Sequence, residues 1–256
     1  MPEYPTEAHA RAADEITRFF AARPETDAVL LVNSCARGLA TPDSCLDLLV
    51  LGDPALEPAW ETFAAESDAV AELARTGRWA EVHLDVDRCD FEPEPFSGGT
   101  FDAFDWLELR VGNAVAYSHP LFERGDRYRR LRERWLPFYG ESLRAERLPA
   151  ACRFVDGRLD RIPWYVERGL WFQALDSLHW AVRGFLRALH VERRVYPISY
   201  DKWIEEQVAG KLGLPELFER PPGLFEIAEL RSDELARKAS ALRALTDAYL
   251  PVESRT

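Results

Sequence analysis

The residues best suited to chemistry lie between positions 31 and 50. A short apolar run ends in the small polar turn Asn33-Ser34, and Arg37 follows closely. A second apolar run begins after this turn, with Asp47 near its start. A hydroxyl and a guanidinium suit phosphate oxygens, and carboxylates are the ligands of hard cations such as Mg²⁺. The spacing predicts a phosphate-holding turn beside a metal-binding carboxylate.

Further acidic residues lie in the stretch 79–88, where apolar and polar residues alternate strictly. Alternation with a period of two is typical of a strand with one apolar and one polar face. Asp85 lies in the middle of the polar face, and Asp87 lies on the same face. The same alternation also fits a solvated strand face with no site.

The order of the predicted elements gives the fold that positions these groups. Before Pro120, helices alternate with short strands; after it, helical apolar periodicity continues to the end. The expected strands are 27–33, 45–51, 79–88 and 106–111. The expected helices are 6–22, 56–76, 126–136, 142–148, 162–191, 200–210 and 232–249. We predict an α/β (α+β) domain with a small mixed sheet at 1–120, and an all-α helical bundle domain at 121–256.

The turn, the strand and the helical second half together resemble the nucleotidyltransferase superfamily. Its signature is Gly-Ser, a spacer and then Asp-x-Asp on a strand, and the layout is similar to aminoglycoside and lincosamide nucleotidyltransferases. The resemblance implies an enzyme that transfers a nucleoside monophosphate from a nucleoside triphosphate (NTP) to a hydroxyl of a small molecule or protein. It also implies an ATP-type nucleotide and Mg²⁺ as the cofactor, with Mn²⁺ as the alternative.

The resemblance also implies a role for individual residues. The triphosphate would be held by Asn33, Ser34 and Arg37. The metal would be held by Asp47 with Asp85 or Asp87. In the helical half, stretches 176–180 and 200–203 are similar to bacterial nucleotidyltransferase-like proteins. There, Asp176 would act as base on the acceptor hydroxyl, and Lys202 would reach the triphosphate as a point charge.

Two positions depart from the superfamily signature. Asn33 stands where the signature has Gly, and Asn is the residue that best tolerates a left-handed backbone after Gly. Cys45 stands where the signature has its first Asp, and a thiol is a soft, mostly protonated group at pH 7 that binds Mg²⁺ poorly. Three interpretations stay open: a one-metal enzyme, a site for another metal, or a pseudoenzyme that binds nucleotide or a protein partner.

Other patterns suggest weaker alternatives. Cys45, His83 and Cys89, with Cys35 nearby, include zinc-ligand types at scattered spacing, and small buried thiols explain them equally well. On 162–191, polar residues recur opposite the apolar stripe and predict a solvated helix face; they are Asp176, His179, Arg183, Arg187 and His190. The pair Arg183 and His190 also looks like the Arg-x-His pattern of helical HEPN-type ribonucleases. An antitoxin-like protein partner is a further alternative.

Charge and composition narrow the class of protein. Of its 256 residues, 47% are hydrophobic, which is enough for sizeable cores. Residues 1–118 hold 8 Lys/Arg against 23 Asp/Glu, a net charge of −15, and residues 119–256 hold 24 against 21, a net charge of +3. The acidic half repels nucleic acid and suits a cationic acceptor or metal ions. No apolar run approaches the roughly 18 residues of a membrane span, and no signal peptide is evident, so we expect a cytoplasmic protein without membrane contact.

Overall fold

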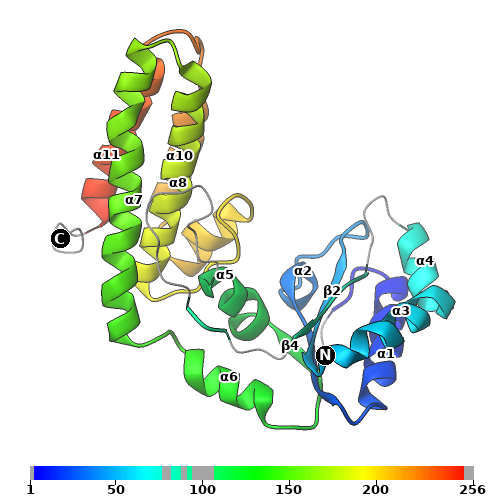
Figure 1. Ribbon diagram of the computed structural model, residues 1–256. Helices are drawn as coiled ribbons and strands as arrows, with labels where there is room; N and C mark the ends of the chain where they lie inside the picture. Colours follow the sequence, from blue (N-terminus) through cyan, green and yellow to red (C-terminus); the bar gives the residue numbers. More distant parts are fainter. Residues whose placement is uncertain (1–2, 77–81, 88–90, 94–106, 251–256) are drawn as a thin grey trace. The chain divides into compact units, whose positions relative to one another are not determined.

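The computed structural model describes residues 3–76, 82–87, 91–93 and 107–250. The chain divides into two compact units (Figure 1). Unit 1 consists of Met1–Glu92 and Arg110–Leu136, and unit 2 consists of Pro93–Leu109 and Pro137–Thr256. The expected boundary at residue 120 differs from this division, because the segment that follows it pairs and packs with unit 1.

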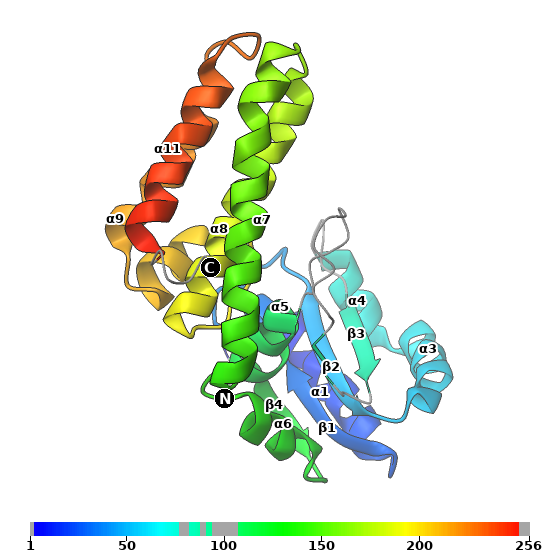
Figure 2. The same cartoon turned by 60° about the vertical axis from the view of Figure 1, so that its left-hand side comes forward.

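Unit 1 is built on a mixed four-stranded sheet, as the sequence predicted. The strands are β1 (Thr26–Leu31), β2 (Leu46–Gly52), β3 (Val82–Asp87) and β4 (His119–Glu123). Their order is β3-β2-β1-β4; β1 is antiparallel to β2 and β4, whereas β2 is parallel to β3 (Figure 2). Helix α1 (Glu7–Ala21) packs on the sheet through Ile16 and Phe20, which are fully buried.

Shorter helices complete unit 1. They are α2 (Asn33–Ala36), η1 (Pro54–Leu56), α3 (Glu57–Glu66), α4 (Asp68–Thr76), α5 (Leu107–Val111), η2 (Gly112–Ala116) and α6 (Arg127–Trp135), of which the first part of α5 belongs to unit 2. The predicted single helix 56–76 is divided at Ser67. The Ser67 hydroxyl accepts a hydrogen bond from the Val70 amide, so this serine caps the second helix instead of continuing the first.

The sequence prediction was wrong on both sides of residue 115. Residues 106–111 were expected to form a strand, and no strand was expected after Val115. Instead, Leu107–Val111 is helical and β4 follows at His119–Glu123. Leu107, Val111 and Val115 are all buried, and their spacing of four residues is the helical one. In a segment of only five residues, apolar side chains at i and i+4 fit both the alternation of a strand and the repeat of a helix, so the pattern does not decide between them.

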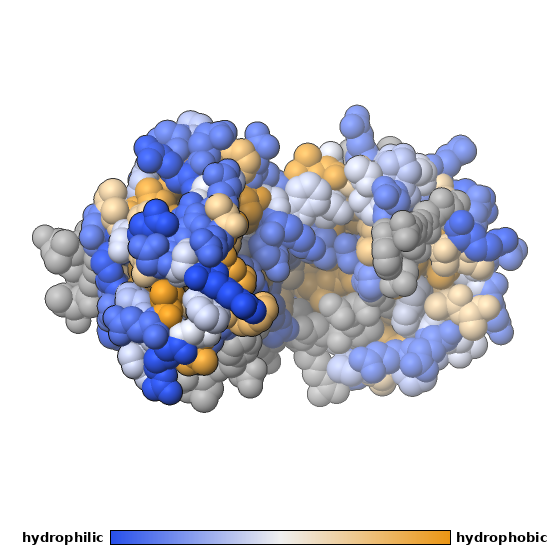
Figure 3. Space-filling view, turned by 90° about the horizontal axis from the view of Figure 1, so that it is seen from above, coloured by the Kyte–Doolittle hydropathy of each residue, from blue (hydrophilic) through white to orange (hydrophobic). Residues whose placement is uncertain are grey.

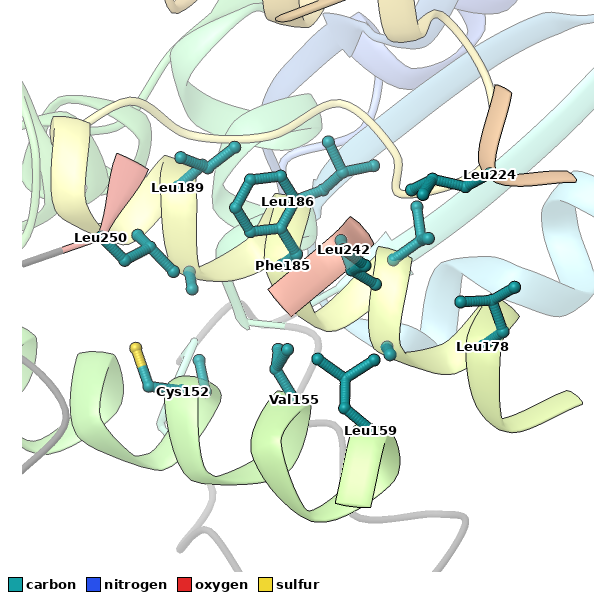
Figure 4. Packing of buried hydrophobic residues seen from close by; sticks show 14 of the residues in the cluster. Cys152, Val155, Leu159, Leu178, Phe185, Leu186, Leu189, Leu224, Leu242 and Leu250 are labelled. Carbon is teal, nitrogen blue, oxygen red and sulfur yellow. The ribbon is translucent and has the colours of Figure 1, made fainter. Parts of the chain in front are cut away.

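Unit 2 is helical, as predicted. Its elements are α7 (Glu141–Glu167), α8 (Trp171–Arg193), η3 (Glu206–Lys211), α9 (Pro215–Phe218), α10 (Arg220–Phe225) and α11 (Glu234–Tyr249). Side chains of α7 and α8 interlock along their length, with Cys152, Val155 and Leu159 facing Phe185 and its neighbours (Figure 4). This apolar seam is the core of unit 2.

Two helix boundaries in unit 2 differ from the prediction. A stop at Pro149 was expected, but α7 runs through Pro149 and Pro163. Burial of its apolar side against α8 outweighs the backbone cost of proline. The predicted helix 162–191 is broken at Gly169, whose φ of 71° is the left-handed conformation that ends many helices.

The surface seen in Figure 3 is predominantly polar. On the faces seen in Figure 3, apolar side chains are dispersed among polar ones. The exposed large apolar residues of unit 2 include Trp164 and Phe172. Within the described residues, no helix is both long and apolar enough to span a membrane.

Candidate functional site

The turn after β1 has the backbone conformation that the sequence led us to expect. Asn33 has φ 55° and so lies in the left-handed region, where Asn is the best substitute for Gly. It opens the four-residue helix α2 directly after the extended residue Val32. Asn33 therefore reverses the chain here without a glycine.

This turn lies directly beside Asp47. The Val32 amide donates a hydrogen bond to the Asp47 carbonyl at 3.1 Å, and the neighbouring pair Leu31 and Leu48 is in register between β1 and β2. The Asp47 side chain is half-buried. The structure thus brings Asn33 and Asp47, fourteen residues apart in sequence, to one edge of the sheet.

Ser34 and Arg37 belong to the same short turn. The Ser34 carbonyl accepts hydrogen bonds from the amides of Arg37, at 3.2 Å, and Leu39, at 3.0 Å. Gly38 has φ 69°, which completes the reversal of the chain. The side chains of Ser34 and Arg37 are half-buried. Both proposed phosphate-contacting groups therefore lie within one tightly bonded turn.

The buried thiol of Cys35 packs against the turn. Cys35 is 1% exposed, and its Sγ donates to the Cys45 carbonyl at 3.4 Å. Burial, followed by the nearby Asp47 and Cys45, raises the pKa of the Cys35 thiol to about 12. Buried and hydrogen-bonded in this way, Cys35 packs under the turn as a small side chain.

The loop that precedes Asp47 is fixed by His9 of α1. Fully buried, His9 donates from Nε2 to the Ser44 carbonyl at 2.9 Å and accepts at Nδ1 from the Thr6 hydroxyl at 2.7 Å. The Thr41 amide donates to the Ser44 hydroxyl at 2.8 Å. Sequence reasoning missed His9, because nothing in its local pattern marks a contact with residue 44.

The acidic residues of β3 lie next to β2 in a defined register. Asp47 pairs with His83, Leu49 with Asp85, and Leu51 with Asp87 in the parallel ladder. The side chains of Asp85 and Asp87 lie outside the part of the chain that the structure describes, so their role as metal ligands stays a prediction. The side chains that are described contain no group of three or more His, Cys, Asp and Glu that could hold a metal ion.

The remaining predicted site residues belong to unit 2. Asp176 lies half-buried on α8, and Lys202 is exposed in the loop before η3. The Lys202 carbonyl accepts from Gln207 Nε2 at 3.0 Å. Their proposed roles toward the acceptor and the triphosphate stay predictions.

The expectation of a solvated polar face on α8 was wrong for two of its residues. Arg187 and His190 are 2% and 1% exposed. Arg187 donates to Glu108 at 3.1 Å, and Glu108 also accepts from Arg147 at 3.0 Å and from Tyr139 at 3.3 Å. No sequence signal linked positions 108, 147 and 187, because their meeting depends on how distant segments of the chain pack.

His190 is a structural residue. Its Nδ1 donates to the Leu186 carbonyl at 2.8 Å, one turn earlier in the helix. Burial lowers the pKa of His190 to about 4, against the opposing effect of this hydrogen bond. A buried, neutral imidazole cannot contact RNA, so the geometry argues against the ribonuclease interpretation of Arg183 and His190.

No protein-family model and no curated protein matches this chain. Among solved structures, the chain is similar to the crystal structure of a nucleotidyltransferase-like protein from Exiguobacterium sibiricum. The identity is 18%, the TM-score is 0.46, and the similarity covers 92% of this chain and 74% of that chain.

Proposed function

We propose that unit 1 binds a nucleoside triphosphate at the turn 32–37 and transfers its nucleoside monophosphate to a hydroxyl of a small molecule or protein. The observation that carries the proposal is the left-handed Asn33 turn held against Asp47 by the Val32 hydrogen bond. It supports the proposal because the hydroxyl of Ser34, the guanidinium of Arg37 and the carboxylate of Asp47 come from segments that meet at one edge of the sheet.

Each residue of the turn has a physical role in this proposal. The Ser34 hydroxyl donates to a phosphate oxygen, and the Arg37 guanidinium compensates its charge. Nucleotidyl transfer depends on positioning and charge neutralisation more than on covalent help from the protein. A turn with fixed backbone hydrogen bonds therefore needs little reorganisation when the nucleotide binds.

The donor set fits a divalent cation only in part. Asp47 supplies a hard oxygen ligand, and Asp85 or Asp87 would supply the second. The group at Cys45 does not fit Mg²⁺, because its sulfur is soft. When bound, Mg²⁺ or Mn²⁺ would neutralise charge on the triphosphate. The proposal is therefore a one-metal arrangement, with Cys45 outside the ligand set.

Isothermal titration calorimetry tests the proposal. ATP, CTP, GTP and UTP are titrated separately with Mg²⁺ and with Mn²⁺. We expect binding of at least one nucleotide, and Asp47→Asn should remove its dependence on the metal. Asp14→Asn is the matched control, since Asp14 is an exposed carboxylate of the same unit on α1. No heat with any nucleotide under either metal would reject the proposal.

A pseudoenzyme is the second candidate, and Cys45 favours it. This residue takes the position of the first signature carboxylate but cannot replace that carboxylate toward Mg²⁺. Cys45→Asp distinguishes the two candidates. If the wild type binds nucleotide but transfers nothing, and Cys45→Asp gains metal-dependent transfer, the scaffold is a nucleotide-binding relic. Transfer by the wild type itself supports the one-metal enzyme.

A further inference from the structure

Unit 2 contains a cavity of about 240 Å³ that is lined by residues of unit 2. Its walls include the apolar residues Phe218, Pro221 and Phe225, and its polar lining includes Arg183, Asp201 and Tyr200. An apolar cavity of about 150 Å³ is known to hold benzene. The present cavity thus has room for one ring together with a small polar group.

The two charged groups of the cavity lie close together. Arg183 Nη2 and Asp201 Oδ2 are 4.0 Å apart, at the outer limit of an ion pair. The Arg183 side chain is 18% exposed, whereas that of Asp201 is 52% exposed. The positive charge therefore lies deeper, and the negative charge lies nearer the solvent.

Both charges are held in place by their neighbours. The Arg183 guanidinium lies over the Trp180 ring, with Cζ 4.9 Å from the ring centroid. The Asp201 carboxylate accepts a hydrogen bond from the Ser199 hydroxyl. These contacts limit the rotamers of both side chains, so little conformational entropy remains to be lost when a ligand binds.

The loop that carries Asp201 is also fixed. Gln207 is 1% exposed, and its Oε1 accepts from the amides of Ile198, at 2.6 Å, and Ser199, at 3.2 Å. Its Nε2 donates to the Ser199 carbonyl at 2.8 Å. The buried Gln207 amide thus provides the hydrogen bonds that regular secondary structure would otherwise give this loop. The loop, and with it this wall of the cavity, is therefore preorganised.

We propose that this cavity binds a free α-amino acid with an apolar side chain. The carboxylate would pair with the deeper Arg183, the ammonium with Asp201 at the mouth, and the side chain would pack on Phe218, Pro221 and Phe225. An α-amino acid carries its ammonium and its carboxylate on one carbon atom and so can pair with both side chains at once. A plain carboxylate would leave its own charge facing Asp201.

Calorimetry with L-phenylalanine and L-leucine tests this assignment. We expect binding of one molecule per chain by at least one of them. The compounds 3-phenylpropionate, which lacks the ammonium, and L-phenylalaninamide, which lacks the carboxylate, should bind more weakly than L-phenylalanine. If neither amino acid binds, or if 3-phenylpropionate binds as tightly as L-phenylalanine, the assignment to an amino acid is wrong.

Variants of the lining residues test whether the amino acid binds in this cavity. Arg183→Met should weaken binding by about tenfold or more, as expected for loss of a hydrogen-bonded charge. Arg168→Met is the matched control, because Arg168 lies over Trp164 at 4.6 Å and does not line the cavity. Since Arg183 is largely buried and its variant can misfold, the exposed wall residue offers a second test: Phe225→Ala should also weaken binding. Unchanged affinity in a folded Arg183→Met or Phe225→Ala variant would overturn the proposal.

Discussion

The Val32 amide and the Asp47 carbonyl share a hydrogen bond of 3.1 Å that joins the turn after β1 to the start of β2. Val32 is the residue before the left-handed Asn33, and Asp47 is the carboxylate that the proposed function requires. The bond makes the turn and the carboxylate one structural element. A change in the backbone conformation of residue 33 should therefore alter the position of residue 47.

The conformation of Asn33 predicts opposite effects for two substitutions. Asn33→Gly should leave the free energy of unfolding unchanged or raise it, because φ 55° costs glycine nothing. Asn33→Val should lower it by about 1–2 kcal/mol, since a β-branched residue is strained in this region. Urea denaturation measures both. A valine variant as stable as the glycine variant would contradict the left-handed turn.

The buried charge cluster of unit 2 predicts a large loss of stability when its acid is removed. Glu108→Leu leaves Arg147 and Arg187 buried without their shared carboxylate and should lower the free energy of unfolding by about 3–5 kcal/mol. As a control, Glu133→Gln breaks the exposed pair with Arg129 and should leave the free energy of unfolding nearly unchanged. Equal effects of the two substitutions would show that Glu108 is not buried with its arginines.

His190 predicts a pH dependence of stability between its unfolded and folded pKa values. In the unfolded chain, the pKa is near the model-peptide value of about 6.5. Burial lowers the folded pKa of His190 to about 4. Within this window the unfolded chain binds more protons, so stability falls as the pH decreases, by up to about 1.4 kcal/mol per pH unit.

Well above pH 6.5, His190 is neutral in both states and contributes no slope. Denaturation curves of the wild type and of His190→Gln, measured from pH 7.5 to 4.5, isolate its contribution. The variant should show a shallower loss of stability in acid than the wild type. Parallel curves would mean that the histidine titrates normally in the folded protein.

The thiols of the turn should differ in reactivity. Cys35 is buried with a raised pKa of about 12, whereas Cys45 is half-buried. Alkylation by iodoacetamide at pH 8, followed by peptide mass spectrometry, should label Cys45 well before Cys35, because the thiolate is the reacting species. Labelling of Cys35 first would contradict the packing under the turn.

The sequence predicted the elements whose local pattern and long-range packing agree. Helix α1 and strands β1 and β2 lie within a few residues of their predicted bounds. The left-handed conformation of Asn33 was predictable because Asn tolerates a positive φ better than other residues except Gly. The juxtaposition of the turn and Asp47 also follows from pairing two adjacent strands.

The errors arose where distant packing decides the structure. Pro149 stays inside α7 because the apolar side of this helix is covered by α8. Glu108 lies in the stretch 106–111 that was expected to form a strand, and its partners Arg147 and Arg187 come from helices 39 and 79 residues away. Local periodicity contains no information about such contacts, so neither the charge cluster nor the buried state of His190 was predictable.

A crystal structure with a non-hydrolysable analogue of the nucleotide and Mn²⁺ tests the central claim most directly. The anomalous signal of manganese locates the metal independently of the protein. The account predicts a manganese peak bonded to the Asp47 carboxylate, with the triphosphate on the turn 32–37. A nucleotide bound at this turn with manganese away from Asp47, or a nucleotide bound elsewhere in the chain, would contradict it.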